Sequence, residues 1–346
     1  MHPTCARSVG WPGRVCGAAM LLAAAIAAPA NALLITPDFD SSITGSANAV
    51  AIEGAIDSAI GTIDSLYANP LSITVEFSYT AAAAGNLLST TQSYYDESYA
   101  AYVAALQADA AANPQNTVLA TALANLASGN NANGTADMAL TGAQASMLGL
   151  LALSPTATDA TININSTQPF AFSRPVSSGA YDLIGGLEHE LNEVLGGGGG
   201  GSTLNAIQQG NAWFTGKFGA LDLYRYSAPG TPSFSPSGSV IAYLSVDGGR
   251  VAIAGLNQES GGDYGDFTPN CGGASGQLIQ NAFNCPGAYE AYNATSPEFA
   301  MLEAIGYDSV VAEPRSAWLF APAVLALGRL RRRANTARAG PRQSPA

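Results

Sequence analysis

Hydrophobic and polar positions follow two clear periods in the first half of the chain. Over 44–67, Val50 and a series of isoleucines recur every three or four residues, which predicts an amphipathic helix. Over 72–79, apolar residues occupy every second position, which predicts a half-buried strand. The same patterns predict further helices over 93–111, after Asn116 and over 142–153, and a further strand over 159–165.

A helical pattern with two distinct faces lies between Ser178 and Leu195. His189 and Glu193 are four residues apart, so they share one face of the predicted helix, beside two glycines that leave room above it. Gly196 follows at a position typical of a helix C-terminus. The opposite face is apolar and consists of Leu183, Ile184, Leu187, Leu191, Val194 and Leu195.

The second half of the chain is richer in short segments and turns. The glycine run 196–201 predicts a mobile loop. The segments 239–246 and 250–254 predict a hairpin, and Ser296 with Pro297 predicts the start of a last helix. We therefore expect an α+β fold over 33–311, with a mixed sheet, a motif helix and a loop- and β-rich C-terminal lobe.

The N-terminus has the parts of a secretory signal. Two arginines precede a short apolar stretch, 15–28, and small residues at positions 30 and 32 form a cleavage site. The stretch is too short for a membrane-spanning helix, which needs about 20 residues. We therefore predict a signal peptide over 1–32 and an exported protein that starts near Leu33.

The C-terminus, 312–346, resembles the PEP-CTERM sorting tail of Gram-negative bacteria. Ala312-Glu313-Pro314 precedes an apolar run and a cluster of arginines that ends at Arg333. Alanine replaces the first proline of that signature, and the chain continues past the cluster; a weakly amphipathic tail is the alternative. The resemblance implies a secreted or cell-surface protein, sorting and processing machinery as a partner, and only transient membrane contact through the signal and the tail.

The body between these ends is strongly acidic. Of the 25 acidic residues, 24 lie between Asp38 and Asp308. The same body holds four cations, namely Arg174, Lys217, Arg225 and Arg250. Binding to nucleic acid or anionic lipid requires basic patches, so both classes of partner are excluded.

Two of the four cysteines, Cys271 and Cys285, lie in this exported body. Export places them in an oxidising compartment, where a structural disulfide is expected. A metal clip made by the two thiolates is the alternative, although no histidine lies nearby.

The chemistry-bearing motif is H-E-x-x-E, which begins at His189, the one histidine left after the signal. It is the zinc-protease motif H-E-x-x-H with a carboxylate at the second ligand position. His189 and Glu193 would be metal ligands, and Glu190, about 100° round the helix, would be the general base. A carboxylate ligand brings manganese or iron into consideration beside zinc. A solvated helix face is the alternative.

The motif resembles the start of the metzincin motif H-E-x-x-H-x-x-G, in which the glycine turns the chain toward a third ligand. Gly199 occupies the expected third position, so this ligand must come from elsewhere. Asp222 is our first candidate, with a turn or an ion pair to Arg225 as the alternative. Asp263 and Asp266 are the next candidates, and their setting is also compatible with a turn or, less favourably, with calcium.

Five segments are similar to a bacterial family of secreted metalloproteases that often end in PEP-CTERM tails. They are 189–196, 221–230, 242–249, 261–267 and 296–308. The resemblance implies a metzincin-like catalytic domain that hydrolyses protein or peptide substrates with zinc. It also implies His189 and Glu193 as ligands and Glu190 as base.

Three other side chains could serve such a site. Met301 could lie beneath the metal, as a methionine does in metzincins, but its apolar neighbours favour core packing. Tyr224 and Tyr264 could stabilise an oxyanion, although tyrosines are frequent in this chain.

Two other functions remain open at this point. A surface or matrix protein could use the same fold for binding alone, and the absent second histidine would be its signature. A module could also bind a metal without hydrolysing anything.

Overall fold

The computed structural model describes residues 33–129, 135–154, 156–271 and 277–310. The predicted signal peptide, 1–32, and the predicted sorting tail, 312–346, lie outside these residues. The described part is a mixed α+β fold with several small sheets, as the sequence predicts. No helix within it is long and apolar enough to cross a membrane.

The first sheet has four strands in the order β1 (Leu34–Phe39), β2 (Ser72–Thr80), β6 (Ala160–Asn165) and β3 (Leu88–Gln92). The strands β1, β2 and β6 run parallel, whereas β3 is antiparallel to β6 and forms an edge of the sheet. The predicted strands over 72–79 and 159–165 are thus confirmed. Each also pairs with a strand that the sequence pattern does not predict, β1 beside β2 and β3 beside β6.

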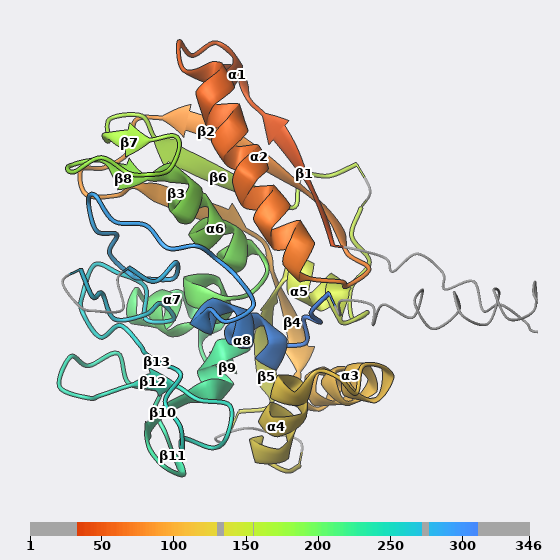
Figure 1. The fold of residues 1–346 in the computed structure, drawn as a ribbon. Helices are drawn as coiled ribbons and strands as arrows, with labels where there is room; N and C mark the ends of the chain where they lie inside the picture. The colour runs from red at the N-terminus through yellow and green to blue at the C-terminus, as the bar shows by residue number, and fades with distance from the viewer. Residues whose placement is uncertain (1–32, 130–134, 155, 272–276, 311–346) are drawn as a thin grey trace, which may run out of the picture. The chain divides into compact units, whose positions relative to one another are not determined.

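Two helices lie side by side against this sheet, α2 (Ala49–Leu66) and α6 (Leu183–Val194) (Figure 1). A short helix, α1 (Ser41–Thr44), precedes α2. The apolar residues of α2 recur at helical spacing and are buried, which confirms the predicted amphipathic helix. Its buried isoleucines are Ile52, Ile56, Ile60 and Ile63.

A second sheet contains β4 (Tyr94–Ser98), β5 (Asp137–Thr141) and β9 (Lys217–Phe218). The helix predicted over 93–111 begins later than expected, because 94–98 pair with β5 as a strand. Ser98 then caps α3 (Tyr99–Ala112) by accepting a hydrogen bond from the Ala101 N–H. The remaining helices here are α4 (Thr117–Asn125), α5 (Gly142–Met147) and α8 (Pro297–Ala304).

The C-terminal lobe is built from short strands and loops. One sheet has the order β11 (Thr231–Pro232), β10 (Arg225–Ala228), β12 (Tyr243–Leu244) and β13 (Ala254–Gly255). The predicted hairpin is present as β12 and β13, although its paired strands are shorter than expected. A disulfide joins Cys271 to Cys285, as predicted. The remaining short elements are β7 (Phe170–Ala171), β8 (Tyr181–Asp182), α7 (Leu204–Gln208), η2 (Ala212–Phe214) and η3 (Leu221–Tyr224).

The prediction of a mobile glycine loop is wrong. Residues 198–201 form the 3-10 turn η1 (Gly198–Gly201), which is largely buried. Gly196 has φ +91° and ends α6, while the Gly197 N–H donates to the Asn192 carbonyl at 2.7 Å. A Cβ at Gly200 would collide with the Glu193 carbonyl. The glycines are therefore required by close backbone packing, rather than by a need for flexibility.

Candidate metal centre

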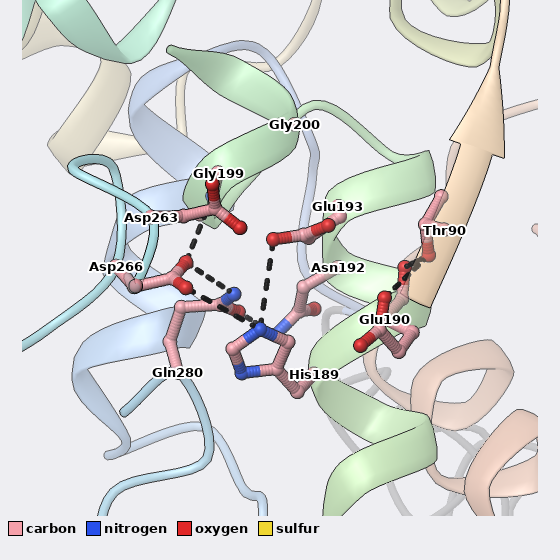
Figure 2. Close-up of polar contacts among 12 residues, drawn as sticks. Thr90, His189, Glu190, Asn192, Glu193, Gly199, Gly200, Asp263, Asp266 and Gln280 are labelled. Carbon is pink, nitrogen blue, oxygen red and sulfur yellow. Dashed lines mark hydrogen bonds and ion pairs between the residues drawn. The ribbon is translucent and has the colours of Figure 1, made fainter. Parts of the chain in front are cut away.

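Helix α6 is buried along its whole length, including its polar face. It starts at Leu183, later than the predicted Ser178, because 181–182 pair with β7. The exposed fraction of His189 is 9% and that of Glu193 is 8%. These values exclude a solvated helix face. The C-terminal lobe covers this face of α6 and contributes side chains to it (Figure 2).

His189 is oriented by a backbone carbonyl. Its Nδ1 lies 3.1 Å from the Ile279 oxygen, which can only accept, so Nδ1 carries the proton. The other ring nitrogen, Nε2, faces two carboxylates and would offer its lone pair to a metal ion bound between them. Nε2 lies 3.5 Å from Glu193 Oε1 and 3.5 Å from Asp266 Oδ2 (Figure 2). This geometry is typical of a histidine that ligates a metal.

Asp266 completes a group of three possible ligands with His189 and Glu193. Each residue offers one donor atom, and these atoms all lie within 4.8 Å of one another. One oxygen of Asp266, Oδ1, accepts from the Gly199 N–H at 2.8 Å and from Gln280 Nε2 at 3.0 Å. Its second oxygen, Oδ2, therefore remains directed at His189. The group can hold a metal ion, since a nitrogen and two carboxylate oxygens are suitable ligands.

Asp222, our first candidate for the third ligand, does not join this group. Its carboxylate accepts hydrogen bonds from Ser202 Oγ at 2.6 Å, the Thr203 N–H at 2.9 Å and the Gly219 N–H at 2.9 Å. These bonds fix a turn, which is the alternative role that the sequence offered. Asp266 replaces Asp222 as the third ligand candidate, because it alone of the predicted aspartates falls within the group.

Because Gly199 has no side chain, carboxylates from α6 and from the C-terminal lobe can pack beside it. A Cβ at this position would lie 2.6 Å from Glu193 Oε1 and 2.7 Å from Asp263 Cβ. A Cβ atom does not approach other atoms this closely, so the neighbouring side chains would have to move. The residue at the expected third-ligand position therefore has no side chain, and side chains distant in sequence occupy that space instead.

Glu190 lies on the side of the cluster that faces β3. Its Oε2 accepts a hydrogen bond from Thr90 Oγ1 at 2.6 Å (Figure 2). Burial raises the pKa of Glu190 to about 7, and the neighbouring charge of Glu193 adds to this rise. A carboxyl group with a pKa near neutrality is well suited to accept and return a proton at physiological pH.

The cluster carries more negative charge than its own side chains can compensate. Burial raises the pKa of Asp263 to about 7, as it does for Asp266, and it also raises that of Glu193. Burial lowers the pKa of His189, but the negative charges of Asp266 and Glu193 outweigh this effect and raise the pKa well above its usual value. Glu193 Oε1 is buried and receives no hydrogen bond. A divalent cation would satisfy this oxygen and the excess charge, so the side chains fit a metal ion.

A buried network behind the cluster was not predicted from the sequence. Asn192 Nδ2 donates to Gln280 Oε1 at 3.3 Å, and the Gln280 N–H donates to Glu298 Oε1 at 2.9 Å. Tyr292 in turn donates to Asn192 Oδ1 at 3.1 Å. Gln280 thus links the motif helix to Asp266 and holds both in place. Its neutral amide gave no signal of this role in the sequence.

The cluster lines a cavity of about 630 Å³. Residues 85–90 at β3 form one wall, and residues 260–264 and 281–284 form others. Among the described residues, no lysine or arginine lines it. This volume lies within the range of small-ligand and substrate sites, about 300–1,000 Å³.

Two of the three additional candidates lie away from the cavity. Met301 is fully buried, and its sulfur accepts from the Gly198 N–H at 3.4 Å, so it supports the glycine turn from below. The Tyr224 hydroxyl donates to the Ala304 carbonyl at 3.0 Å. Tyr264 does line the cavity.

Comparison of the chain with protein-family models, with curated proteins and with solved structures gives no match. The resemblance to secreted metalloproteases therefore stays a prediction, and the geometry of the cluster carries the functional argument.

Proposed function

We propose that this protein is an exported zinc-dependent peptidase with a metzincin-like catalytic domain. The observation that carries the proposal is the convergence of His189, Glu193 and Asp266 beside Glu190 in the lining of a cavity. The parallel strands with an antiparallel edge strand, and the motif helix packed against them, support the metzincin-like assignment. The disulfide supports export, because such bonds persist in oxidising compartments.

The three ligand candidates would leave part of the coordination sphere open. When bound, the ion would act as a Lewis acid. It would polarise the scissile carbonyl and lower the pKa of a water molecule. His189 Nε2 would be the nitrogen ligand, with its ring fixed by the Ile279 carbonyl. Glu193 and Asp266 would neutralise the charge of the ion.

Glu190 would move the proton during hydrolysis. Its carboxylate would accept a proton from the attacking water and return it to the leaving amine. Thr90 holds the carboxylate by one oxygen and leaves the other free to do this. A pKa near 7 suits both steps, because the group must be deprotonated in the first and protonated in the second.

The edge strand β3 offers a binding surface for an extended peptide. No described strand pairs with its outer edge, and residues 85–90 line the cavity. Its free backbone groups can pair with a peptide that lies along it. Such a peptide would pass directly beside Thr90 and Glu190.

The test is peptide hydrolysis and metal content in the exported protein and in two variants. Glu190→Gln should lower kcat/KM by about 10²- to 10⁴-fold while the zinc content is unchanged. Asp57→Asn removes an exposed carboxylate from α2 and should leave activity unaltered. A broad peptide library read by mass spectrometry detects cleavage without a known substrate. Full activity of Glu190→Gln would exclude the assigned base, and bound zinc without any hydrolysis would favour a metal-binding module.

A further inference from the structure

Asp263 is a partly buried carboxylate that the proposed mechanism does not use. It lines the cavity and lies close to Glu193, but it does not belong to the group of three ligands. No described residue donates a hydrogen bond to its side chain, and no described lysine or arginine pairs with it. A carboxylate without a partner at this position would be stabilised by a cation that enters the cavity.

The charge balance of the cavity leads to the same conclusion. A divalent ion would offset Glu193 and Asp266, and Glu190 has a hydrogen-bond donor in Thr90. Asp263 alone would then remain charged without a partner. The rest of the lining is rich in amides, among them Asn205, Gln208 and Asn281, which add polar groups but no positive charge.

The position of Asp263 suits substrate recognition. It lies on the opposite side of the cluster from Thr90 and Glu190 (Figure 2). A substrate group at Asp263 would therefore flank the reacting bond without blocking the base. The acidic body of the protein would also attract cationic peptides over longer distances.

We propose that Asp263 selects peptides that carry a cationic nitrogen next to the scissile bond. This inference rests on the proposed peptidase function. Two sources share the required chemistry, namely a lysine or arginine side chain and a free α-amino group. Either would bring a positive charge to a partly buried carboxylate, where such a pair is stronger than in open water.

The experiment measures binding, so that it does not depend on cleavage. The zinc-loaded exported protein carrying Glu190→Gln is titrated with short peptides that differ only by lysine or glutamine at each position in turn. Each peptide is used with a free and with an acetylated amino terminus. We expect the cationic peptide to bind about tenfold more tightly at one position. Tighter binding of the free than of the acetylated peptides identifies the α-amino group, whereas a lysine preference that persists on acetylation identifies the side chain.

The variants are Asp263→Asn, Asp263→Glu and Glu259→Gln, all made in the same background. Glu259 lies in the same loop but is exposed and does not line the cavity, so its removal changes the net charge alone. Asp263→Asn should abolish the preference for the cationic peptide, while Glu259→Gln and the charge-conserving Asp263→Glu should retain it.

Three results would overturn the inference. They are the absence, with Asp263 intact, of any preference for lysine over glutamine or for a free over an acetylated amino terminus, a preference that survives in Asp263→Asn, and loss of zinc from Asp263→Asn. The last result would make Asp263 a metal ligand. If the preference depends on Asp263 but no peptide is cut by the protein with Glu190 intact, the inference stands and the proposed peptidase function fails.

Discussion

The neighbouring helices α2 and α6 have similar hydrophobic patterns, but they differ in the exposure of their charged side chains. Asp57 of α2 faces solvent, as expected for the polar side of an amphipathic helix. On α6, the exposed fractions of Glu188, Glu190 and Glu193 are 0%, 7% and 8%. A helix buried on all sides is normally apolar on all sides. Buried carboxylates require a cation or hydrogen-bond donors to offset the cost of burial. We therefore interpret α6 as a functional element and α2 as a structural one.

Among changes that test this difference between the two helices, we expect the largest effect from an added methyl group at the α6 cluster. Gly199→Ala places a Cβ 2.6 Å from Glu193 Oε1 and close to Asp263, so the ligands must move apart. We expect the affinity for zinc to fall by about 10- to 100-fold, as when the supporting groups of metal sites are disturbed. Competition with a chromogenic chelator measures this change. Unaltered affinity would show that the packing around Gly199 does not define the site.

A pH dependence should distinguish the α6 cluster from the rest of the molecule. Burial raises the pKa of Glu190, Asp263 and Asp266 to about 7, above the values near 4 of an unfolded chain. The folded, metal-free protein thus binds more protons between these values, and its stability is lost as the pH rises toward and through 7. Zinc competes with these protons, so its affinity falls below pH 7.

Thermal unfolding with and without zinc at pH 5, 6, 7 and 8 tests this expectation. The increase in Tm on addition of zinc should be small at pH 5 and should grow toward pH 8. An increment that does not change with pH would contradict the predicted competition between zinc and protons at the cluster.

The smallest effect is expected on α2. Gly61 is exposed in the interior of this helix, and a Cβ there meets no atom within 4 Å. Gly61→Ala should therefore raise the free energy of unfolding by about 0.5–1 kcal/mol through helix propensity and a less flexible unfolded chain. Urea unfolding measures the gain, and zinc affinity should be unaffected. A loss of stability would mean that α2 is not the simple surface helix described above.

The sequence predicts well what depends on neighbours along the chain. The spacing within H-E-x-x-E places His189 and Glu193 on one face of a helix and Glu190 beside them, because a helix fixes those directions. The strands β2 and β6 follow from alternation alone. The late start of α3 was missed because pairing of 94–98 with a distant strand overrides their local preference.

The rest of the site depends on contacts between segments far apart in the chain. The Ile279 carbonyl that orients His189 is 90 residues away from it. Asp266 and Gln280 come from irregular loops, whose course is set by tertiary packing and not by a period. Asp222 and Asp266 both lie in motif-like stretches, so composition could not rank them. The glycine run 196–201 led to a wrong prediction of mobility, because glycine permits close backbone packing as well as motion.

The most direct test of the account is the zinc content of the exported protein beside Asp266→Asn and Asp222→Asn. Each protein is offered zinc at neutral pH, dialysed and analysed, with circular dichroism to verify folding. We predict about one zinc per chain in the wild type and in folded Asp222→Asn, and little or none in Asp266→Asn. Full zinc in Asp266→Asn would contradict the proposed ligand set, above all if Asp222→Asn lost the metal instead.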